Sequence, residues 1–440
     1  MDFARQTAFE TLLRIERDGA YGNLALGAAL DSSGLNERDT AFCASLVYGV
    51  TERQISLDWL LSRLLSKPIA RLRPPVITAL RMGAYQLHYM DSVPASAAVD
   101  TSVRLLKANG CAYAAGLANA VLRKCAATGP KYPEQGDDES LSIRYSVPQW
   151  LVELWRGAYG EEAMHKLLAA GLEHGGQYLR VNTTKTDTEG LIAALAEEGI
   201  EAKPSPALPN AVILPKGTAP QKTKAFAAGL YHAQGLASQY CCAALNAKGA
   251  ERVLDICAAP GGKSFTLAQD ARQLTAVELY PQRAELVRKG AKRLGLGNIE
   301  VITADAAALN PSDTGIFDAV LCDVPCSGLG TLSKKPDIRK KDRSSLDNLP
   351  AIQYTIFCNA AFFVRDGGRL IYSTCTLNPA ENELLCKRFL AEHGEFEADG
   401  NFLKGLPRRT EDGAFLTLLP HIHGCDGFFI AVFKKGRGNG

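Results

Sequence analysis

The second half of the chain alternates strand-like and helix-compatible runs, and this alternation constrains the fold more than any other feature. Five apolar runs, each followed by a segment able to form a helix, read RVLDIC, QLTAVEL, IEVIT, FDAVLCD and RLIYST. Such an alternation is typical of a parallel β-sheet covered by helices. Two last strand-like stretches, residues 415–419 and 427–433, have no helix between them. We expect them to form an antiparallel addition at the edge of the sheet.

The preceding residues carry different patterns. From Ala4 to about Ala126, apolar side chains recur every three or four residues, which predicts a bundle of α-helices. A polar segment with Pro and Gly, residues 128–140, predicts a linker. Beyond the linker, an amphipathic stretch, two short strand-like runs and one more helical run predict a small α+β domain.

A length of 440 residues is compatible with about three domains. We therefore predict a multidomain protein with an all-α bundle, a small α+β domain and a C-terminal α/β domain of Rossmann-like type. Their expected ranges are residues 1–128, 140–232 and 233–440.

Composition and charge narrow the choice of partners. The 49 Lys and Arg residues nearly balance the 47 Asp and Glu residues, for a net charge of +2, so a surface for nucleic acid must come from local clustering. The 12 cysteines include no C-x-x-C pair, so we expect reduced thiols and no metal site. The start of the chain lacks the pattern of a signal peptide, and no apolar run is long enough for a membrane span. We expect a cytoplasmic protein without a membrane partner.

The first candidate site is the segment VLDICAAPGGK, in which a strand leads into a glycine turn and then a helix. Ligands of doubly wound sheets bind outside the carboxyl ends of the strands, and Gly261 and Gly262 would let the backbone approach one closely. A P-loop would need a glycine where Cys257 stands, and the dinucleotide pattern G-x-G-x-x-G is absent. A tight turn without a ligand explains an isolated glycine pair equally well.

Two acids at the ends of the next strands favour a ligand. Glu278 ends the second strand, where an acidic side chain can accept hydrogen bonds from both ribose hydroxyls. Asp305 follows the third strand and could accept a hydrogen bond from the exocyclic amine of adenine. Since no diphosphate-binding motif accompanies these acids, S-adenosylmethionine fits the pattern better than a dinucleotide.

Two cysteines follow the fourth and fifth strands. Asp323 ends the fourth strand and leads into Cys326 of a P-C motif, and Cys375 lies in a T-C motif after the fifth strand. Carbon 5 of cytosine becomes nucleophilic only after a thiolate adds at C6, so methylation of that carbon requires a cysteine. Asp323 could stabilise the adduct at N3. Either cysteine alone is more typical of a buried core residue, but two at neighbouring strand ends favour catalysis.

Several motifs together resemble a known superfamily. LDICAAPGGK, AVELYPQR, DVPCSGLGTLSKKPDIR, YSTCTLNPAENE and DGFFIAVFKK are similar to motifs of the RNA cytosine-C5 methyltransferases. ERDTAFCASLVYGV and LRMGAYQLHYMDSVPASAAVD, in the helical part, resemble the NusB-like antitermination-factor domain. The combination is similar to the family of bacterial ribosomal RNA small subunit methyltransferase B, and the likeness covers nearly the whole chain.

The resemblance implies a site and a reaction. S-adenosyl-L-methionine would be the cofactor, Cys375 the nucleophile, Cys326 the residue that assists product release, and Asp323 the third catalytic residue. The implied target is C5 of one cytosine in 16S rRNA, cytosine 967 in that RNA's numbering. Glu278 departs from the family by standing where Asp is common, and Gly235 replaces an acid. The implied cofactor-binding residues are Cys257, Ala258, Ala259, Pro260, Gly261, Gly262, Lys263, Glu278, Asp305 and Asp323.

A local excess of positive charge follows the P-C motif. Residues 331–345 contain six basic and two acidic side chains, which gives +4 in this stretch alone. A solvated surface is the ordinary explanation of such a run, but its place beside Cys326 favours contact with RNA phosphates. The residues that we expect to bind RNA are Lys334, Lys335, Arg339 and Lys340.

Alternatives stay open from the sequence. The catalytic motifs also suit a methyltransferase of transfer RNA or 23S rRNA, and the helical domain alone would suit a non-catalytic RNA-binding or antitermination factor. Residue patterns do not decide which cysteine attacks the base. We expect a monomer that acts on an unpaired or flipped-out base of 16S rRNA, either naked or in an early small-subunit particle.

Overall fold

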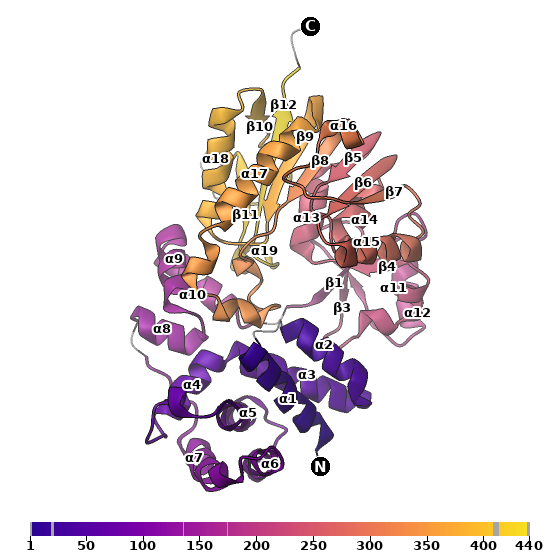
Figure 1. Cartoon of the computed structure of the whole chain (residues 1–440). Coiled ribbons are helices and arrows are strands. Elements are labelled where there is room, and N and C mark those ends of the chain that lie inside the picture. Colours follow the sequence, from indigo (N-terminus) through magenta and orange to yellow (C-terminus); the bar gives the residue numbers. More distant parts are fainter. Residues whose placement is uncertain (1, 19–21, 135, 174, 408–412, 438–440) are drawn as a thin grey trace. The chain divides into compact units, whose positions relative to one another are not determined.

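The computed structural model describes residues 2–18, 22–134, 136–173, 175–407 and 413–437 of the chain (Figure 1). The chain divides into two compact units, each of which takes residues from two separate parts of the sequence. Unit 1 is Met1–Glu173 with Leu332–Asp342, and unit 2 is His174–Thr331 with Arg343–Gly440.

Unit 1 is helical, as the pattern of apolar residues predicts. Apolar side chains of its first seven α-helices form one shared core. The third helix begins where Asn36 accepts a hydrogen bond from the backbone N–H of Asp39, at 2.9 Å. The helices are α1 (Phe3–Asp18), α2 (Gly22–Ser33), α3 (Glu37–Glu52), α4 (Gln54–Ser62), α5 (Pro74–Tyr89), α6 (Ala95–Ala108) and α7 (Ala115–Thr128).

Three more helices belong to unit 1 by their contacts. They are α8 (Asp138–Tyr145), α9 (Gln149–Tyr159) and α10 (Glu161–Ala170). The buried Ser56 hydroxyl of α4 donates to the carbonyl of Ile143 in α8 at 2.6 Å, which joins these helices to the bundle. The expected middle domain, residues 140–232, therefore spans both units, and the boundary between compact units lies at residue 173.

The rest of the expected middle domain forms a small antiparallel sheet in unit 2. Its strands are in the order β2-β3-β1-β4, and α11 (Thr188–Ala196) packs against them. The structure thus confirms an α+β character for this region. The strands are β1 (Gln177–Val181), β2 (Lys203–Pro204), β3 (Ala211–Leu214) and β4 (Tyr231–Ala233), and α12 (Lys224–Ala227) precedes β4.

The large sheet of unit 2 has the strand order β10-β12-β9-β8-β5-β6-β7, and β11 also pairs with β12. Strands β5 to β9 are parallel to one another, which confirms the predicted α/β domain. The strands are β5 (Arg252–Asp255), β6 (Gln273–Glu278), β7 (Ile299–Thr303), β8 (Phe317–Asp323), β9 (Val364–Thr374), β10 (Phe396–Ala398), β11 (Phe415–Leu418) and β12 (Phe428–Lys435).

The last two strands form the antiparallel addition that the sequence predicts, at one end of the parallel strands, and β12 is an inner strand of that addition. Strand β12 pairs with β9 on one side and with β10 and β11 on the other. Its residues from Phe428 to Phe433 are all buried, and they alternate between the cores on the two faces of the sheet. An apolar strand buried on both faces is more stable inside a sheet than at its edge.

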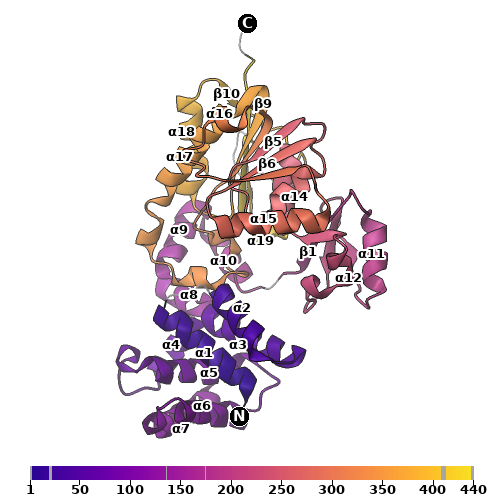
Figure 2. The same ribbon diagram turned by 45° about the vertical axis from the view of Figure 1, so that its right-hand side comes forward.

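Helices cover both faces of the large sheet (Figure 2). Val253 of β5 packs with one helical layer, and the next residue, Leu254, packs with the other. The first layer contains α13 (Leu236–Leu245), α14 (Gly262–Ala268) and α15 (Pro281–Leu294). The second contains α17 (Leu349–Phe362) and α18 (Glu383–Glu392). In the described part of the chain, no helix is long and apolar enough to cross a membrane.

Candidate active site

The glycine turn joins β5 to α14 at the carboxyl end of β5, an inner strand of the sheet. Gly261 has φ of +105°, a conformation that side chains other than glycine's disfavour, and it directly precedes α14. A Cβ atom at Gly261 would come within 2.4 Å of the Phe265 ring. The local sequence therefore requires glycine here, and the turn leaves backbone groups next to the N-terminus of a helix.

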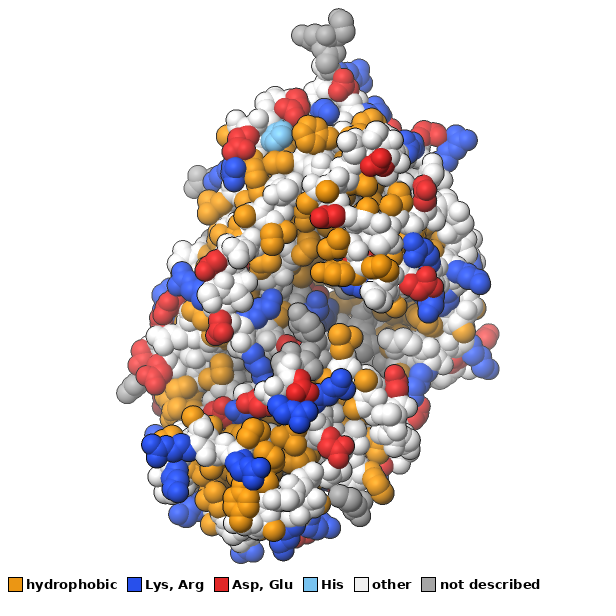
Figure 3. Space-filling model, in the orientation of Figure 1, with side chains coloured by type: hydrophobic (Ala, Val, Ile, Leu, Met, Phe, Trp, Pro, Cys, Tyr) orange, Lys and Arg blue, Asp and Glu red, His pale blue; other side chains and the backbone are white. Residues whose placement is uncertain are grey.

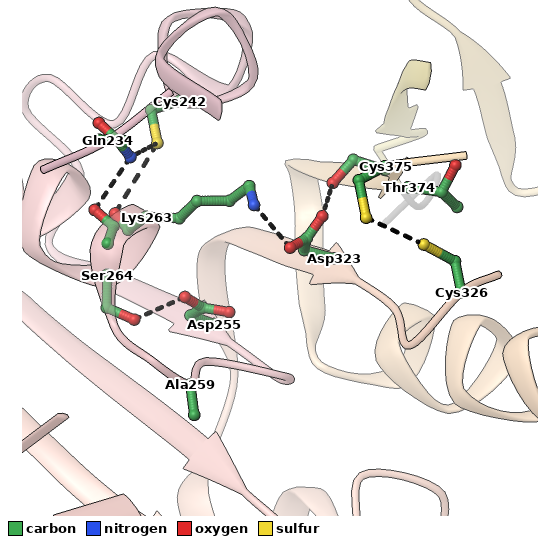
Figure 4. Close-up of polar contacts among 12 residues, drawn as sticks. Gln234, Cys242, Asp255, Ala259, Lys263, Ser264, Asp323, Cys326, Thr374 and Cys375 are labelled. Atoms are coloured by element: carbon green, nitrogen blue, oxygen red, sulfur yellow. Dashed lines mark hydrogen bonds and ion pairs between the residues drawn. The ribbon is translucent and has the colours of Figure 1, made fainter. Parts of the chain in front are cut away.

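A buried acid lies below the turn. Asp255, the last residue of β5, accepts a hydrogen bond of 2.6 Å from the Ser264 hydroxyl in α14 (Figure 4). Burial raises the pKa of Asp255 to about 6, with the nearby charge of Asp323 acting in the same direction and Ser264 against it. The Asp255 side chain holds the start of α14 in place from inside the unit.

Glu278, the last residue of β6, lies beside the glycine turn. It is 4% exposed, and its carboxylate accepts hydrogen bonds from the backbone N–H groups of Ala259 at 3.3 Å and Tyr280 at 3.1 Å. Arg283 donates to Glu278 at 3.3 Å and to the carbonyl of Ala259 at 2.9 Å. The predicted ribose acceptor and the predicted cofactor loop thus meet at one point.

Asp305 follows the neighbouring strand, β7. It is exposed, and one oxygen of its carboxylate accepts a hydrogen bond from the backbone N–H of Ala307 at 2.9 Å. The adenosyl group of S-adenosylmethionine would thus lie beside three suitable groups. They are the backbone of the glycine turn, a buried carboxylate on β6 and an exposed carboxylate after β7. The residues present fit that cofactor.

Asp323, at the end of β8, forms an ion pair with Lys263 of the glycine turn. The Lys263 ammonium lies 2.6 Å from one Asp323 oxygen, and the Ser373 hydroxyl donates to the other at 2.8 Å (Figure 4). Burial lowers the pKa of Lys263, but the charge of Asp323 and the hydrogen bond to it raise that pKa above its usual value on balance. Lys263 therefore stays protonated and links the cofactor turn to the Asp323 carboxylate.

The two predicted cysteines lie together. The sulfur atoms of Cys326 and Cys375 are 3.3 Å apart and point toward each other (Figure 4). Both side chains are partly exposed. The contact with Cys375, and then burial, raise the pKa of Cys326 well above its usual value. The backbone N–H of Gly330 donates to the carbonyl of Cys375 at 3.0 Å, so the two loops are also joined through their main chains.

Models of three protein families match consecutive parts of the chain. The NusB family matches residues 3–127, the ferredoxin-like domain of RsmF/B-like methyltransferases matches 147–220, and 16S rRNA methyltransferase RsmB/F matches 242–434. A probable ribosomal RNA small subunit methyltransferase B of Bacillus subtilis is 37% identical over 98% of both chains. The chain belongs to the ribosomal RNA small subunit methyltransferase B family.

Two further proteins extend this result. A probable methyltransferase B of Synechocystis is 36% identical, over 98% of this chain and 99% of its own. The crystal structure of PH0851 has a TM-score of 0.83 and 24% identity, covers 98% of this chain and 99% of its own, and shows the same fold. As a member of the methyltransferase B family, the chain is an rRNA methyltransferase whose cofactor is S-adenosyl-L-methionine.

The structure also contains polar residues at this site that the sequence patterns did not single out. Ser373 contacts Asp323, and Glu381 is buried beside the loop that carries Cys326. Both lie in YSTCTLNPAENE, where only the cysteine stood out, because reading along the sequence does not reveal contacts across a fold. A polar residue that ends a strand beside the T-C motif was the available signal for Ser373.

The four expected RNA-binding residues divide into exposed and buried cations, and all four lie in unit 1. Lys334 and Lys335 are exposed, whereas Arg339 is 3% exposed. Arg339 donates to the backbone carbonyls of Tyr145 and Ser146, at 2.8 and 3.0 Å, and to that of Gly171. The expectation that Arg339 binds RNA does not fit this geometry, because its guanidinium is enclosed by the protein.

Lys340 is exposed, but its ammonium faces a carboxylate of the same unit. Its ammonium lies 3.7 Å from a Glu16 carboxylate oxygen, and burial lowers its pKa. A lysine that already faces a carboxylate attracts a phosphate less strongly than an exposed one. Of the four expected RNA-binding residues, Lys334 and Lys335 have the most accessible side chains.

Proposed function

We propose that this methyltransferase transfers a methyl group to C5 of a single cytosine in 16S rRNA, cytosine 967 by the family resemblance. The observation that carries the proposal is the pair of sulfur atoms 3.3 Å apart at the ends of β8 and β9, next to Asp323. Methylation at a nitrogen or an oxygen of a base needs no thiol, whereas methylation at cytosine C5 needs one to activate the ring.

In the first step, the Cys375 sulfur forms a bond to C6 of the base. The thiol proton ends on N3, and electron density moves to C5. Asp323 accepts a hydrogen bond from N3–H and so stabilises the adduct, while Lys263 and Ser373 hold the carboxylate in position. When bound, S-adenosylmethionine supplies an electrophilic methyl group on a positively charged sulfur.

In the second step, C5 takes the methyl group, and the methyl donor leaves as neutral S-adenosylhomocysteine. C5 then gives its proton to water, and the N3 proton returns to the Cys375 sulfur once that sulfur has left C6. The electron pair of the broken C5–H bond re-forms the C5–C6 double bond, and the bond between C6 and the Cys375 sulfur breaks. Cys326 lies next to that sulfur and assists this release. Its raised pKa keeps it a thiol at neutral pH, able to donate a hydrogen bond to the departing thiolate.

The RNA would be held by local groups of positive charge. On the face drawn in Figure 3, Lys and Arg side chains are interspersed with Asp and Glu, in agreement with a net charge of +2. We propose that Lys334 and Lys335, exposed and within nine residues of Cys326 in the sequence, contact phosphates near the target base. The base itself must be unpaired or flipped out for C6 to reach a sulfur.

The test is transfer of labelled methyl groups to separately purified small-subunit rRNA, large-subunit rRNA and transfer RNA, followed by analysis of the nucleosides. Label in 5-methylcytidine from the small-subunit RNA alone is the expected result. Label in transfer RNA or large-subunit RNA would keep the chemistry and overturn the substrate. Absence of label from all three, and from early small-subunit particles, would overturn the proposal in favour of a binding factor.

A further inference from the structure

A buried carboxylate lies behind the two cysteine loops, outside the set of groups that the reaction uses. Glu381, at the end of a short helical turn, Pro379–Glu381, has a side chain with 0% exposure. It accepts four hydrogen bonds from neutral donors, two on each oxygen. Holding an ionisable side chain in such a place costs stability, so the position suggests a role beyond packing.

One oxygen of Glu381 holds the backbone of the Cys326 loop. It accepts from the backbone N–H of Ser327 at 2.8 Å and from the side-chain amide of Gln353 at 2.8 Å. The same Gln353 nitrogen donates to the carbonyl of Pro325 at 2.9 Å. The residues on both sides of Cys326 are therefore fixed through Glu381 and Gln353.

The other oxygen connects this loop to the one that carries Cys375. It accepts from the Ser327 hydroxyl at 2.5 Å and from the Asn378 amide at 2.9 Å. The Ser327 oxygen also lies 2.6 Å from the hydroxyl of Thr376, the residue after Cys375. Since the single hydrogen of Ser327 goes to Glu381, Thr376 donates to Ser327.

We propose that Glu381 is a positioning residue that holds the Cys326 loop against the Cys375 loop, so that the two sulfur atoms stay in contact during turnover. The expected consequence is that Glu381 acts on the release step through Cys326, and this consequence rests on the proposed function. Glu381 acts on the cysteine loops through Ser327 and Gln353, and a carboxylate is suited to this place because it accepts on both oxygens and donates on neither.

The first test uses Glu381→Gln, which keeps the shape of the side chain. In one orientation, the new amide nitrogen faces the N–H donors of Ser327 and Gln353. In the other orientation, it faces the Asn378 amide and the Ser327 hydroxyl. In either case, at least one of the four hydrogen bonds is lost. The control is Glu383→Gln, two residues away, because Glu383 contacts Thr417 instead of either cysteine loop.

The first readout is the rate at which diamide oxidises the Cys326–Cys375 pair, followed by mass spectrometry of the linked peptides. In this reaction the two thiols give up two protons and two electrons to the diazene, which becomes a hydrazine, and a disulfide forms. We expect Glu381→Gln to slow this reaction by at least about tenfold, since an ångström of displacement is enough to disrupt such geometry. Glu383→Gln should react at the wild-type rate.

The second readout is the RNA–protein adduct. Glu381→Gln should lower kcat by about tenfold or more with little change in the KM for RNA, and a covalent adduct should accumulate, as in Cys326→Ala. Combining Glu381→Gln with Cys326→Ala should add little to the effect of Cys326→Ala alone. A purely structural role would lower the amount of folded enzyme without an accumulation of adduct.

The two readouts separate the two proposals. A wild-type rate of disulfide formation in Glu381→Gln overturns the positioning role, whatever happens with RNA. A slowed disulfide with no adduct in Cys326→Ala leaves the positioning role and overturns the proposed chemistry. If Glu381→Gln does not fold, Ser327→Ala decides, because it removes the link between the loops and should slow disulfide formation, whereas a wild-type rate would overturn the inference.

Discussion

Lys263 in unit 2 is a partly buried cation and Arg339 in unit 1 is a buried one, and the protein stabilises their charges in different ways. Lys263 faces the carboxylate of Asp323, and the pairing outweighs burial and raises its pKa. Arg339 is held by the neutral carbonyls of Tyr145, Ser146 and Gly171, and burial lowers its pKa to about 10. The charge paired with a charge lies at the proposed catalytic site, whereas the charge paired with peptide dipoles holds a segment in place.

The contrast also shows why a run of charges is a weak guide to function. Lys335 and Arg339 lie four residues apart in the same basic segment, yet one is exposed and the other closes the ends of two helices. The carbonyls that Arg339 binds lie at or just beyond the carboxyl ends of α8 and α10, where backbone acceptors lack partners within the helix.

The largest effect is expected from Lys263→Met. The substitution leaves the partly buried Asp323 carboxylate without its cation, and a loss of about 3–4 kcal/mol of transition-state stabilisation lowers methyl transfer by about a hundred- to a thousandfold. The control is Lys289→Met, which removes an exposed lysine from α15. Methyl transfer within about threefold of wild type in Lys263→Met would remove the ion pair from the account of catalysis.

The next effect is expected on folding, from Arg339→Met. Three helix-end carbonyls lose their donor, so the free energy of unfolding should fall by about 2–4 kcal/mol. Cofactor affinity should be unchanged, since S-adenosylmethionine binds in unit 2. Chemical denaturation and calorimetry with the cofactor measure the two quantities. Unchanged stability together with weaker RNA binding would restore the phosphate-binding role of Arg339.

A third effect concerns pH and a carboxylate near Lys263. Because burial raises the pKa of Asp255 to about 6, its stabilising contribution is present below about pH 4 and is lost as the pH rises through 6. Asn in its place imitates the protonated acid, so Asp255→Asn should be the more stable protein at pH 8, by at most about 3 kcal/mol. Thermal unfolding at pH 8 and pH 4 should show the difference shrinking at the lower pH. A difference that is constant with pH would contradict the assigned titration.

The smallest effect is expected from Lys335→Ala. If this lysine contacts a phosphate, the slope of log affinity against log salt concentration should become shallower by about 0.7, as for one contact to a single strand. Lys387→Ala, on the exposed side of α18, is the control and should leave the slope unchanged. An unchanged slope in Lys335→Ala would place the RNA elsewhere.

The sequence predicted the parts of the fold that depend on local patterns. Strands β7 and β8 begin and end at the expected residues. For β8 the reason is that a buried parallel strand is a short apolar run bounded by polar residues. The sequence did not predict that β12 lies between β9 and β10, because an apolar run does not indicate which strands will lie beside it. The grouping of α8–α10 with unit 1 depends on packing that is distant in sequence.

The candidate site, like the fold, could be predicted only where local sequence patterns mark it. Cys326, Cys375, Asp323 and Glu278 could be found because each follows or ends a strand, and strand ends meet at one edge of a sheet. Glu381 could not, since its partner Ser327 lies 54 positions earlier and only the folded chain brings them together. Arg339 was misjudged for the same reason, because burial of a cation is decided by distant carbonyls.

The central claim is that Cys375 forms the bond to the base. The most direct test replaces the target cytidine in a small-subunit RNA fragment with 5-fluorocytidine, which blocks loss of the C5 substituent and traps the adduct after methyl transfer. Digestion and mass spectrometry then identify the linked cysteine. The account predicts the nucleotide on Cys375 in the wild-type protein and in Cys326→Ala, and no adduct in Cys375→Ala. The nucleotide on Cys326, or an adduct that persists in Cys375→Ala, would contradict it.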